Sequence, residues 1–214
     1  MTTSDSIPLL LFAKAPIAGK VKTRLMPRCS AEQASDVAEL LMEASIQQAC
    51  ESWPGAVYLS AWLDLEHDFF VKMQQSYPIS ITQQCEGDLG EKMRHGLARF
   101  GYPAAVMGCD APHVLSSTLQ LAYESLSRGK SVIGPSEDGG YYLLGLCQDA
   151  NALFSDMPWG GDQVLGETFS RAASIDLNLY ELSPLNDVDE WQDLLNAAQQ
   201  LPSLRRYLQA QDLI

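Results

Sequence analysis

The stretch IPLLLFAKAPIAGKVKTRL, residues 7–25, joins a continuous apolar run to a basic loop. Residues 7–13 have the length and unbroken hydrophobicity of a strand buried on both faces, as in a parallel sheet. The following loop carries a glycine among lysines and an arginine, so its N–H groups and cationic heads can converge on an oxyanion. The stretch predicts an α/β sheet with an anion-binding turn after its first strand. A solvated basic loop is the alternative.

This loop differs from the phosphate-binding loop of P-loop ATPases. Gly19-Lys20 is followed by Val21 where that motif requires Ser or Thr, and Lys14 stands where its first glycine should be. The sequence therefore argues against a P-loop ATPase.

Charge is distributed unevenly along the chain. The net charge is −13, yet no acid stands between Asp5 and Glu32, and five of the 14 basic residues do. These five are Lys14, Lys20, Lys22, Arg24 and Arg28. A cationic segment on an acidic protein suits a small anionic ligand, and the net charge argues against binding a nucleic acid polymer.

Apolar runs and helical periodicity alternate along the rest of the chain. Capping-box spacing occurs at Ser30/Gln33, Asp88/Glu91, Ser117/Gln120 and Asp187/Glu190. Further strands are predicted at 56–62, 79–83, 103–108, 131–134, 141–146 and 177–182. A long helix is predicted from Ser30, with others at 65–76, 88–100, 115–128, 162–173, 188–199 and 202–211. This alternation predicts one α/β domain over residues 1–214 with a mostly parallel sheet.

The chain carries no sign of export or of a membrane span. Its start lacks the basic segment of a signal peptide, and no apolar run is long enough to cross a bilayer. The five cysteines are odd in number, widely spaced and without a C-x-x-C pair, which favours reduced, mostly buried thiols over a disulfide framework or a zinc site. We expect a cytoplasmic protein that does not bind membranes.

In open α/β sheets the ligand lies at the carboxyl ends of the strands. Polar residues follow the predicted strands at 87–90, at Asp110 and at 137–138. Asp110 could present a carboxylate to a divalent cation, or its Asp-Ala-Pro could be an ordinary turn. In NDVDEWQDLL, residues 186–195, a capping box would account for Asp187 and Glu190 but not for Asp189, so metal binding is an alternative there too.

Three more groups admit both a structural and a functional interpretation. Glu137-Asp138-Gly139-Gly140 is either a tight turn or an acidic loop that holds a ligand. Trp159 either stacks on a ligand or packs in the core. His113 is expected to be structural, with a role as a base as the alternative. Together, a cationic loop and carboxylates after later strands are what a metal-bridged diphosphate requires.

The chain also resembles an uncharacterised bacterial family of GT-A-like nucleotide-diphospho-sugar transferases. The resemblance rests on six ordered motifs between about residue 9 and residue 195: FAKAPIAGKVKTRL, GDLGEKM, GCDAP, GPSEDGGYYLLGL, PWGGDQV and DVDEWQDL. It implies a three-layer α/β/α sandwich. The fold is shared with nucleotidyltransferases of the molybdopterin-guanine dinucleotide and phospholactate guanylyl types.

The resemblance also implies roles for individual residues. It implies a nucleotide site at Lys14, Gly19, Lys20, Lys22, Arg24, Gly87 and Asp88. It implies Mg²⁺ or Mn²⁺ on Asp110 and Asp189, with Asp187 beside them, and an acceptor or sugar site at Glu137, Gly139, Gly140 and Trp159. Asp138 would act as the catalytic base. Gly161 departs from the pattern, because related chains carry Thr or Ser there.

The expected activity is transfer of a sugar from a nucleotide-sugar donor to a small acceptor, by an enzyme that could form a homodimer. One alternative is a nucleotidyltransferase that joins an NTP to a phosphorylated or acidic metabolite and releases pyrophosphate. Another is a nucleotide-binding module without turnover, which the retention of Asp110, Asp138 and Asp189 together disfavours.

Overall fold

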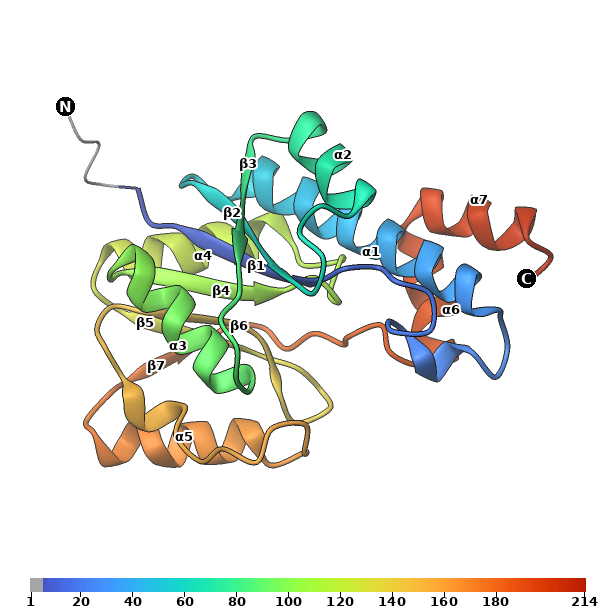
Figure 1. Cartoon of the computed structure of the whole chain (residues 1–214). Coiled ribbons are helices and arrows are strands. Elements are labelled where there is room, and N and C mark those ends of the chain that lie inside the picture. The colour runs from blue at the N-terminus through green and yellow to red at the C-terminus, as the bar shows by residue number, and fades with distance from the viewer. Residues whose placement is uncertain (1–5) are drawn as a thin grey trace.

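A computed structural model describes residues 6–214 as a seven-stranded sheet covered by helices (Figure 1). The strands are β1 (Leu9–Lys14), β2 (Val57–Trp62), β3 (Ile79–Gln83), β4 (Ala104–Gly108), β5 (Ser131–Pro135), β6 (Tyr141–Leu146) and β7 (Leu179–Glu181). The helices are α1 (Ala31–Ser52), α2 (Asp68–Ser76), α3 (Leu89–Phe100), α4 (Ser116–Ser127), α5 (Val164–Ser174), α6 (Trp191–Gln200) and α7 (Pro202–Ala210), with short 3₁₀ turns η1 (Thr23–Leu25) and η2 (Asn151–Leu153).

The sheet is mostly parallel, as predicted. Its strand order is β3-β2-β1-β4-β6-β5-β7. β1 lies in the middle and pairs in parallel with β2 and β4, while β6 runs antiparallel to both β4 and β5. Leu9, Leu10 and Leu11 of β1 are buried, which is why its sequence is a continuous apolar run.

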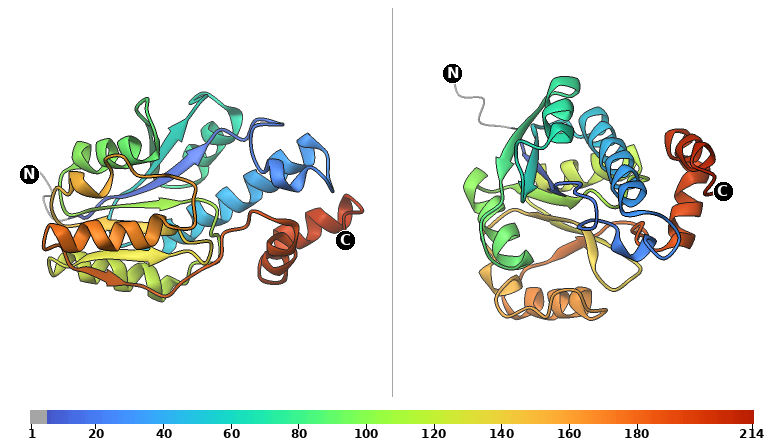
Figure 2. Two further views of the ribbon diagram at one scale, coloured as in Figure 1. Left: turned by 90° about the horizontal axis from the view of Figure 1, so that it is seen from below. Right: turned by 45° about the vertical axis from the view of Figure 1, so that its right-hand side comes forward.

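The two faces of the sheet are covered by different helices (Figure 2). One core contains Ile46 of α1, Phe70 of α2 and Leu119 of α4. The other contains Leu97 of α3 and Ala172 of α5. The predicted three-layer α/β/α sandwich is therefore confirmed.

Helices α6 and α7 lie beside α1, away from the sheet (Figures 1 and 2). They enclose a third core, in which Leu25 of the basic loop and Val188 pack with Leu41 of α1 and Leu204 of α7. This small core joins the basic loop to the segment that carries Asp187 and Asp189. It therefore brings together two parts of the chain that are far apart in sequence.

Two of the four predicted capping boxes are present and two were wrong. The boxes at Ser30/Gln33 and Asp88/Glu91 are confirmed. Helix α4 begins at Ser116 without a side-chain cap, so the predicted box at Ser117/Gln120 does not form. The box predicted at Asp187/Glu190 is shifted, because Asp193 Oδ2 accepts a hydrogen bond from the N–H of Glu190, 2.8 Å away. Asp187 is therefore not a capping residue.

All five cysteines are free thiols, as expected, but the prediction that most are buried was wrong: Cys109 alone is buried, and the other four are partly exposed. No helix within residues 6–214 is both long and apolar enough to cross a membrane.

Candidate active site

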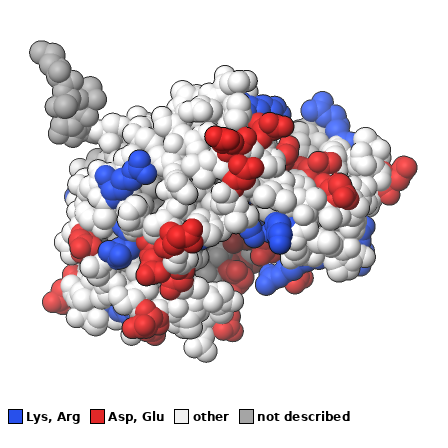
Figure 3. All heavy atoms as spheres, viewed as in Figure 1, with Lys and Arg blue, Asp and Glu red and all other residues white. Residues whose placement is uncertain are grey.

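A cavity of about 200 Å³ lies at the carboxyl ends of β1 and β4. It is lined by Phe12, Ala13, Lys14, Lys20, Val21, Lys22, Ala38, Met42, Cys109, Asp110 and Asp189. The space-filling view shows a hollow beside this region, with acidic atoms within it and basic atoms on its right-hand side (Figure 3). The cavity lies where the topology of an open α/β sheet predicts a ligand.

Lys22 is at the centre of this site. Its Nζ lies 2.5 Å from Asp110 Oδ1 and 3.2 Å from Asp189 Oδ1, and it donates a hydrogen bond to the Val188 carbonyl oxygen over 2.7 Å. The side chain is 6% exposed. Burial alone would lower the pKa of this ammonium, but the charges and hydrogen bonds of the two aspartates raise it above its usual value. Lys22 is therefore a charged group held by two carboxylates.

The two aspartates are positioned by different parts of the fold. Asp110 follows β4, and its carbonyl oxygen accepts a hydrogen bond from the N–H of Val188 over 3.0 Å. Asp189 Oδ2 also lies 3.3 Å from Nη1 of Arg24, whose side chain is 69% exposed. The structure thus brings Lys22, Arg24, Asp110 and Asp189 together, as the motifs implied.

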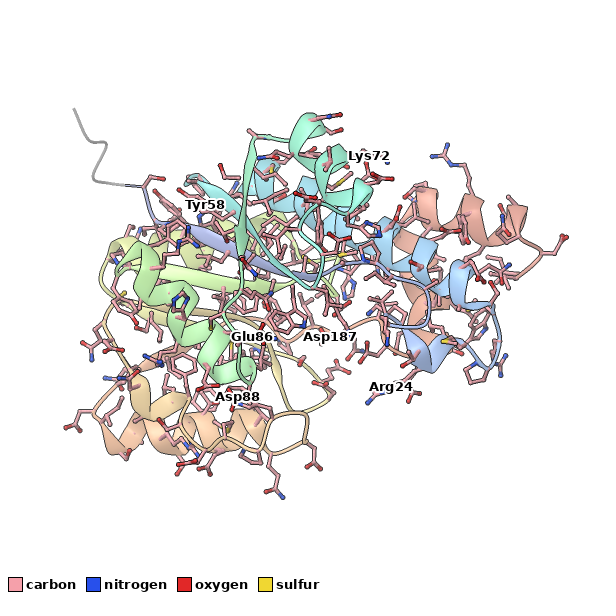
Figure 4. All side chains as sticks on the ribbon, viewed as in Figure 1. Arg24, Tyr58, Lys72, Glu86, Asp88 and Asp187 are labelled. Carbon is pink, nitrogen blue, oxygen red and sulfur yellow. The ribbon has the colours of Figure 1, made fainter. Side chains whose placement is uncertain are left out.

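Asp187 lies near the middle of the molecule (Figure 4), close enough to Asp110 and Asp189 to feel their charges. Within residues 6–214 it forms no ion pair. Burial, followed by the charges of Asp110, Asp138 and Asp189, raises its pKa from 3.8 to about 7, while Lys22 acts in the opposite direction. The site therefore holds more negative charge than Lys22 alone can balance. A carboxyl group with a pKa of about 7 is a place where a further cation would be stabilised.

The acids suit a divalent cation that is shared with a phosphorylated ligand. Within residues 6–214, no group of three His, Cys, Asp or Glu side chains converges tightly enough to hold a metal unaided. Mg²⁺ is typically bound by one or two carboxylates together with substrate phosphates. Asp110 and Asp189 already enclose a cation, the Lys22 ammonium, so their donor oxygens fit this role.

The other predicted nucleotide-site residues of the loop lie beside Lys22. Lys14 Nζ donates a hydrogen bond to the Lys20 carbonyl oxygen over 2.7 Å, and both residues line the cavity. Gly19, at the turn between them, has a φ of +77°. Left-handed backbone of this kind favours glycine, so the loop shape depends on this residue.

The loop between β5 and β6 is a turn whose carboxylate is fixed in place. Asp138 Oδ1 accepts hydrogen bonds from the Ser136 hydroxyl over 2.5 Å and from the N–H of Gly140 over 3.1 Å. Asp138 is near enough to raise the pKa of Asp187. The exposed Glu137 is held through its backbone, whose N–H donates to the Leu185 carbonyl oxygen. The turn and the acidic-loop interpretations of this sequence are thus compatible.

The turn also packs on a second loop. Gly139 has a φ of +91°, and a Cβ at this position would overlap the Asp162 carbonyl oxygen. Its own carbonyl oxygen accepts a hydrogen bond from the N–H of Leu165, 2.8 Å away. The turn at 137–140 is therefore docked against the segment that follows Trp159.

Gly87, Asp88 and Trp159 lie apart from the cavity lining. Asp88 caps α3 and lines a separate hollow with Arg94 and Phe154. The Trp159 ring is half-buried and packs closely on Gly90, where an added Cβ would lie 2.7 Å from the indole. Its Nε1 is buried and makes no hydrogen bond within residues 6–214. This geometry favours the packing interpretation of Trp159.

His113 is likewise outside the cavity lining. Its Nδ1 is buried and has no hydrogen-bond partner in the described part of the chain, and burial lowers the pKa of its imidazole.

Sequence reasoning missed one pair at the same edge of the sheet. Lys92 Nζ of α3 lies 3.3 Å from the centre of the Trp62 ring, at the end of β2. The signal in the sequence was a tryptophan in the last position of a strand next to β1.

Comparison with known proteins gives both a family and a fold. The sequence profile of a family described as "Uncharacterized protein conserved in bacteria (DUF2064)" matches residues 30–161. Curated protein sequences gave no match. A solved structure from Desulfovibrio desulfuricans G20, described as a "putative nucleotide-diphospho-sugar transferase", is similar with a TM-score of 0.78 and 25% identity, over 94% of this chain and 97% of that one.

Two other solved structures share the fold at lower identity. One is 4-diphosphocytidyl-2C-methyl-D-erythritol synthase from Anaerococcus prevotii, with a TM-score of 0.60 and 12% identity over 92% of this chain and 97% of that one. The other is Rv0371c from Mycobacterium tuberculosis in complex with manganese, with a TM-score of 0.51 and 18% identity over 92% and 100%.

Proposed function

This chain belongs to the DUF2064 family of uncharacterised proteins conserved in bacteria, and we propose that it is a metal-dependent glycosyltransferase with a nucleotide-diphospho-sugar donor. The class of the donor is supported by the similarity to the D. desulfuricans protein described as a nucleotide-diphospho-sugar transferase. Manganese in the Rv0371c structure supports a divalent cation in this fold. The acceptor is a small molecule with a hydroxyl group.

One observation carries the proposal: Lys22 is held between Asp110 and Asp189 in a cavity that Lys14 and Lys20 also line. Lys14 and Lys20 form no ion pair with a carboxylate of residues 6–214, and such lysines can bind diphosphate oxygens. A divalent cation on Asp110 and Asp189 would neutralise the diphosphate and stabilise it as a leaving group. Lys22 would then turn from the aspartates to a phosphate oxygen, and its positive charge would remain in the site.

The acceptor would lie between this cavity and the turn at 137–140. Asp138 is held by Ser136 and Gly140 through one oxygen, and the other oxygen makes no hydrogen bond within residues 6–214. That free oxygen would take the proton of the acceptor hydroxyl as the sugar is transferred. Glu137 and the backbone of Gly139 and Gly140 would complete the acceptor site.

Calorimetry with a panel of nucleotide sugars and NTPs, with and without Mn²⁺, tests this function. We expect Mn²⁺ to strengthen the binding of nucleotide sugars to the wild type, and to have no such effect on the Asp110→Asn variant. The control is Asp149→Asn, which changes an exposed acid elsewhere and should bind as the wild type does. Incubation with an acceptor panel should then release nucleoside diphosphate. Selective NTP binding with release of pyrophosphate would instead indicate a nucleotidyltransferase, and tight binding without turnover would indicate a binding module.

A further inference from the structure

Trp62 and Lys92 form a pair at the same edge of the sheet as the candidate active site. Trp62 is the last residue of β2 and pairs in register with Lys14, the last residue of β1. The N–H of Ala15 donates to the Trp62 carbonyl oxygen over 3.0 Å, so the basic loop begins beside the backbone of Trp62. Lys92 belongs to α3, and its Nζ lies over the Trp62 ring, 3.3 Å from the ring centre.

Among residues 6–214, the Trp62 ring is the group that holds the Lys92 ammonium. It forms no ion pair and no side-chain hydrogen bond with any residue from 6 to 214, and it is half-buried. Burial lowers the pKa of Lys92 and the charge of Lys14 adds to this effect, while Glu86, Cys85 and Asp88 oppose it. An ammonium has three N–H donors. An aromatic face attracts its charge but offers these donors no acceptor atom. These donors are therefore available to a ligand.

The backbone beside the ring is strained. Leu63, which follows Trp62, has a φ of +77° and is 45% exposed. A leucine in the left-handed region is unfavourable, and such residues persist where the surrounding structure imposes them, often at ligand sites.

Strand order places this pair at one end of the candidate site. Along the edge the order is Trp62 on β2, Lys14 on β1, Asp110 after β4 and then Asp138 after β5. Adjacent strands are about 4.8 Å apart, so β2 lies about 10 Å from β4. A nucleotide whose diphosphate lies between Lys14 and Asp110, and whose sugar points toward Asp138, would direct its base toward Trp62. An indole offers a flat apolar surface to such a base.

We propose that Trp62 and Lys92 form the nucleobase subsite, in which the base takes the place of the Lys92 ammonium on the face of Trp62 and Lys92 moves to the edge of the base, where it donates a hydrogen bond to a carbonyl oxygen. The inference rests on the proposed function for the position of the diphosphate. It assigns the donor to nucleotides of guanine, uracil, thymine or cytosine. Adenine has no carbonyl oxygen and would leave the partly buried ammonium without this acceptor, so adenine nucleotides should bind more weakly.

Calorimetry with GTP, UTP, CTP, ATP and inorganic pyrophosphate, all with Mg²⁺, tests the subsite. We expect the three carbonyl-bearing nucleotides to bind at least about tenfold more tightly than ATP. Lys92→Met keeps the length and the contact with Trp62, and should weaken their binding about tenfold while ATP and pyrophosphate are unchanged. Trp62→Leu should weaken all four nucleotides alike and spare pyrophosphate. Lys72→Met, which removes an equal charge from α2, is the control.

The possible outcomes separate the two proposals. Equal affinity of the wild type for all four nucleotides overturns the subsite and leaves the proposed function standing. An equal loss of pyrophosphate and nucleotide binding in Lys92→Met overturns the subsite too, because Lys92 would then contact phosphate. Binding of neither nucleotides nor pyrophosphate to the wild type overturns both proposals.

Discussion

Asp110 and Asp189 hold the same cation, the ammonium of Lys22, at 2.5 and 3.2 Å. The first aspartate follows a central strand, and the second precedes a helix near the end of the chain. Their meeting depends on the small core of α1, α6, α7 and the basic loop, in which Leu25 and Val188 pack together. The charge of the site is therefore coupled to the packing of the C-terminal helices.

Removal of the central cation should destabilise the protein and increase its response to divalent ions. Lys22→Met leaves Asp110 and Asp189 without the ammonium between them. Because these aspartates are about half exposed, we expect the free energy of unfolding to fall by about 2 kcal/mol rather than by the larger amount typical of a fully buried pair. Urea unfolding with and without Mn²⁺ measures this, and Mn²⁺ should restore more stability to the variant than to the wild type.

Lys130→Met is the control for Lys22→Met, because it removes one exposed charge away from the cavity. Equal urea midpoints of Lys22→Met and the wild type would contradict the view that Lys22 balances the two aspartates.

Asp187 should make stability depend on pH. Its pKa in the folded protein, about 7, is above its ordinary value of 3.8, so the folded state binds more protons between these values. The free energy of unfolding contributed by this group therefore falls as the pH rises from about 4 to about 7. Asp187→Asn removes this effect. The free energy of unfolding of the variant should therefore exceed that of the wild type by about 3 kcal/mol at pH 8 and by much less at pH 5.

Urea unfolding of Asp187→Asn and the wild type at pH 5 and pH 8 measures the difference. A difference in the free energy of unfolding of the same size at both pH values would show that Asp187 does not cause the pH dependence. Mn²⁺ should narrow the gap at pH 8, because a bound cation stabilises the charged form of the wild-type carboxyl.

The turn at 137–140 should not tolerate a side chain at Gly139. Gly139→Ala combines a φ of +91° with an overlap on the Asp162 carbonyl oxygen. We expect the free energy of unfolding to fall by more than about 2 kcal/mol, or the turn to shift and transfer activity to fall while nucleotide binding is kept. Chemical unfolding, nucleotide calorimetry and an acceptor-dependent assay distinguish these results.

Two other glycines serve as matched controls. Gly129→Ala has a φ of +75° with no atom within 4 Å of an added Cβ, so it isolates the backbone cost, about 1 kcal/mol. Gly166→Ala lies in α5 with free space around it, and should stabilise by about 0.5–1 kcal/mol. If Gly139→Ala lowers the free energy of unfolding no more than Gly129→Ala does, the overlap with Asp162 adds no cost to the backbone conformation.

The turn carboxylate should affect transfer more than donor binding. Asp138→Asn keeps an oxygen that can accept from Ser136 and Gly140, but it removes the carboxylate that we propose as the base. We expect kcat to fall at least about 100-fold with little change in the affinity for the donor. Asp149→Asn should be unchanged in both, and an Asp138→Asn enzyme with unaltered kcat would exclude Asp138 as the base.

The sequence by itself determined the main strands, the mostly parallel sheet and the edge at which the candidate site lies. Residues 7–13 could be assigned because a strand buried on both faces has a continuous apolar run. The helix starts at Ser30 and Asp88 could be assigned because capping boxes have a fixed local spacing. These signals come from contacts between residues near one another in the chain. Six ordered motifs added the family, which the match over residues 30–161 agrees with.

Only the tertiary structure decided which side chains meet. Local spacing assigned Asp187 to a helix cap, whereas Asp193 forms that cap and Asp187 lies among other acids. Asp88 has the expected capping role but lies on a different hollow from Lys22, and the pairing of Lys92 with Trp62 joins a helix to a strand. These contacts depend on how helices dock on the sheet and on α1, which is set by packing between residues distant in sequence. For that reason no local pattern of charge or hydrophobicity records them.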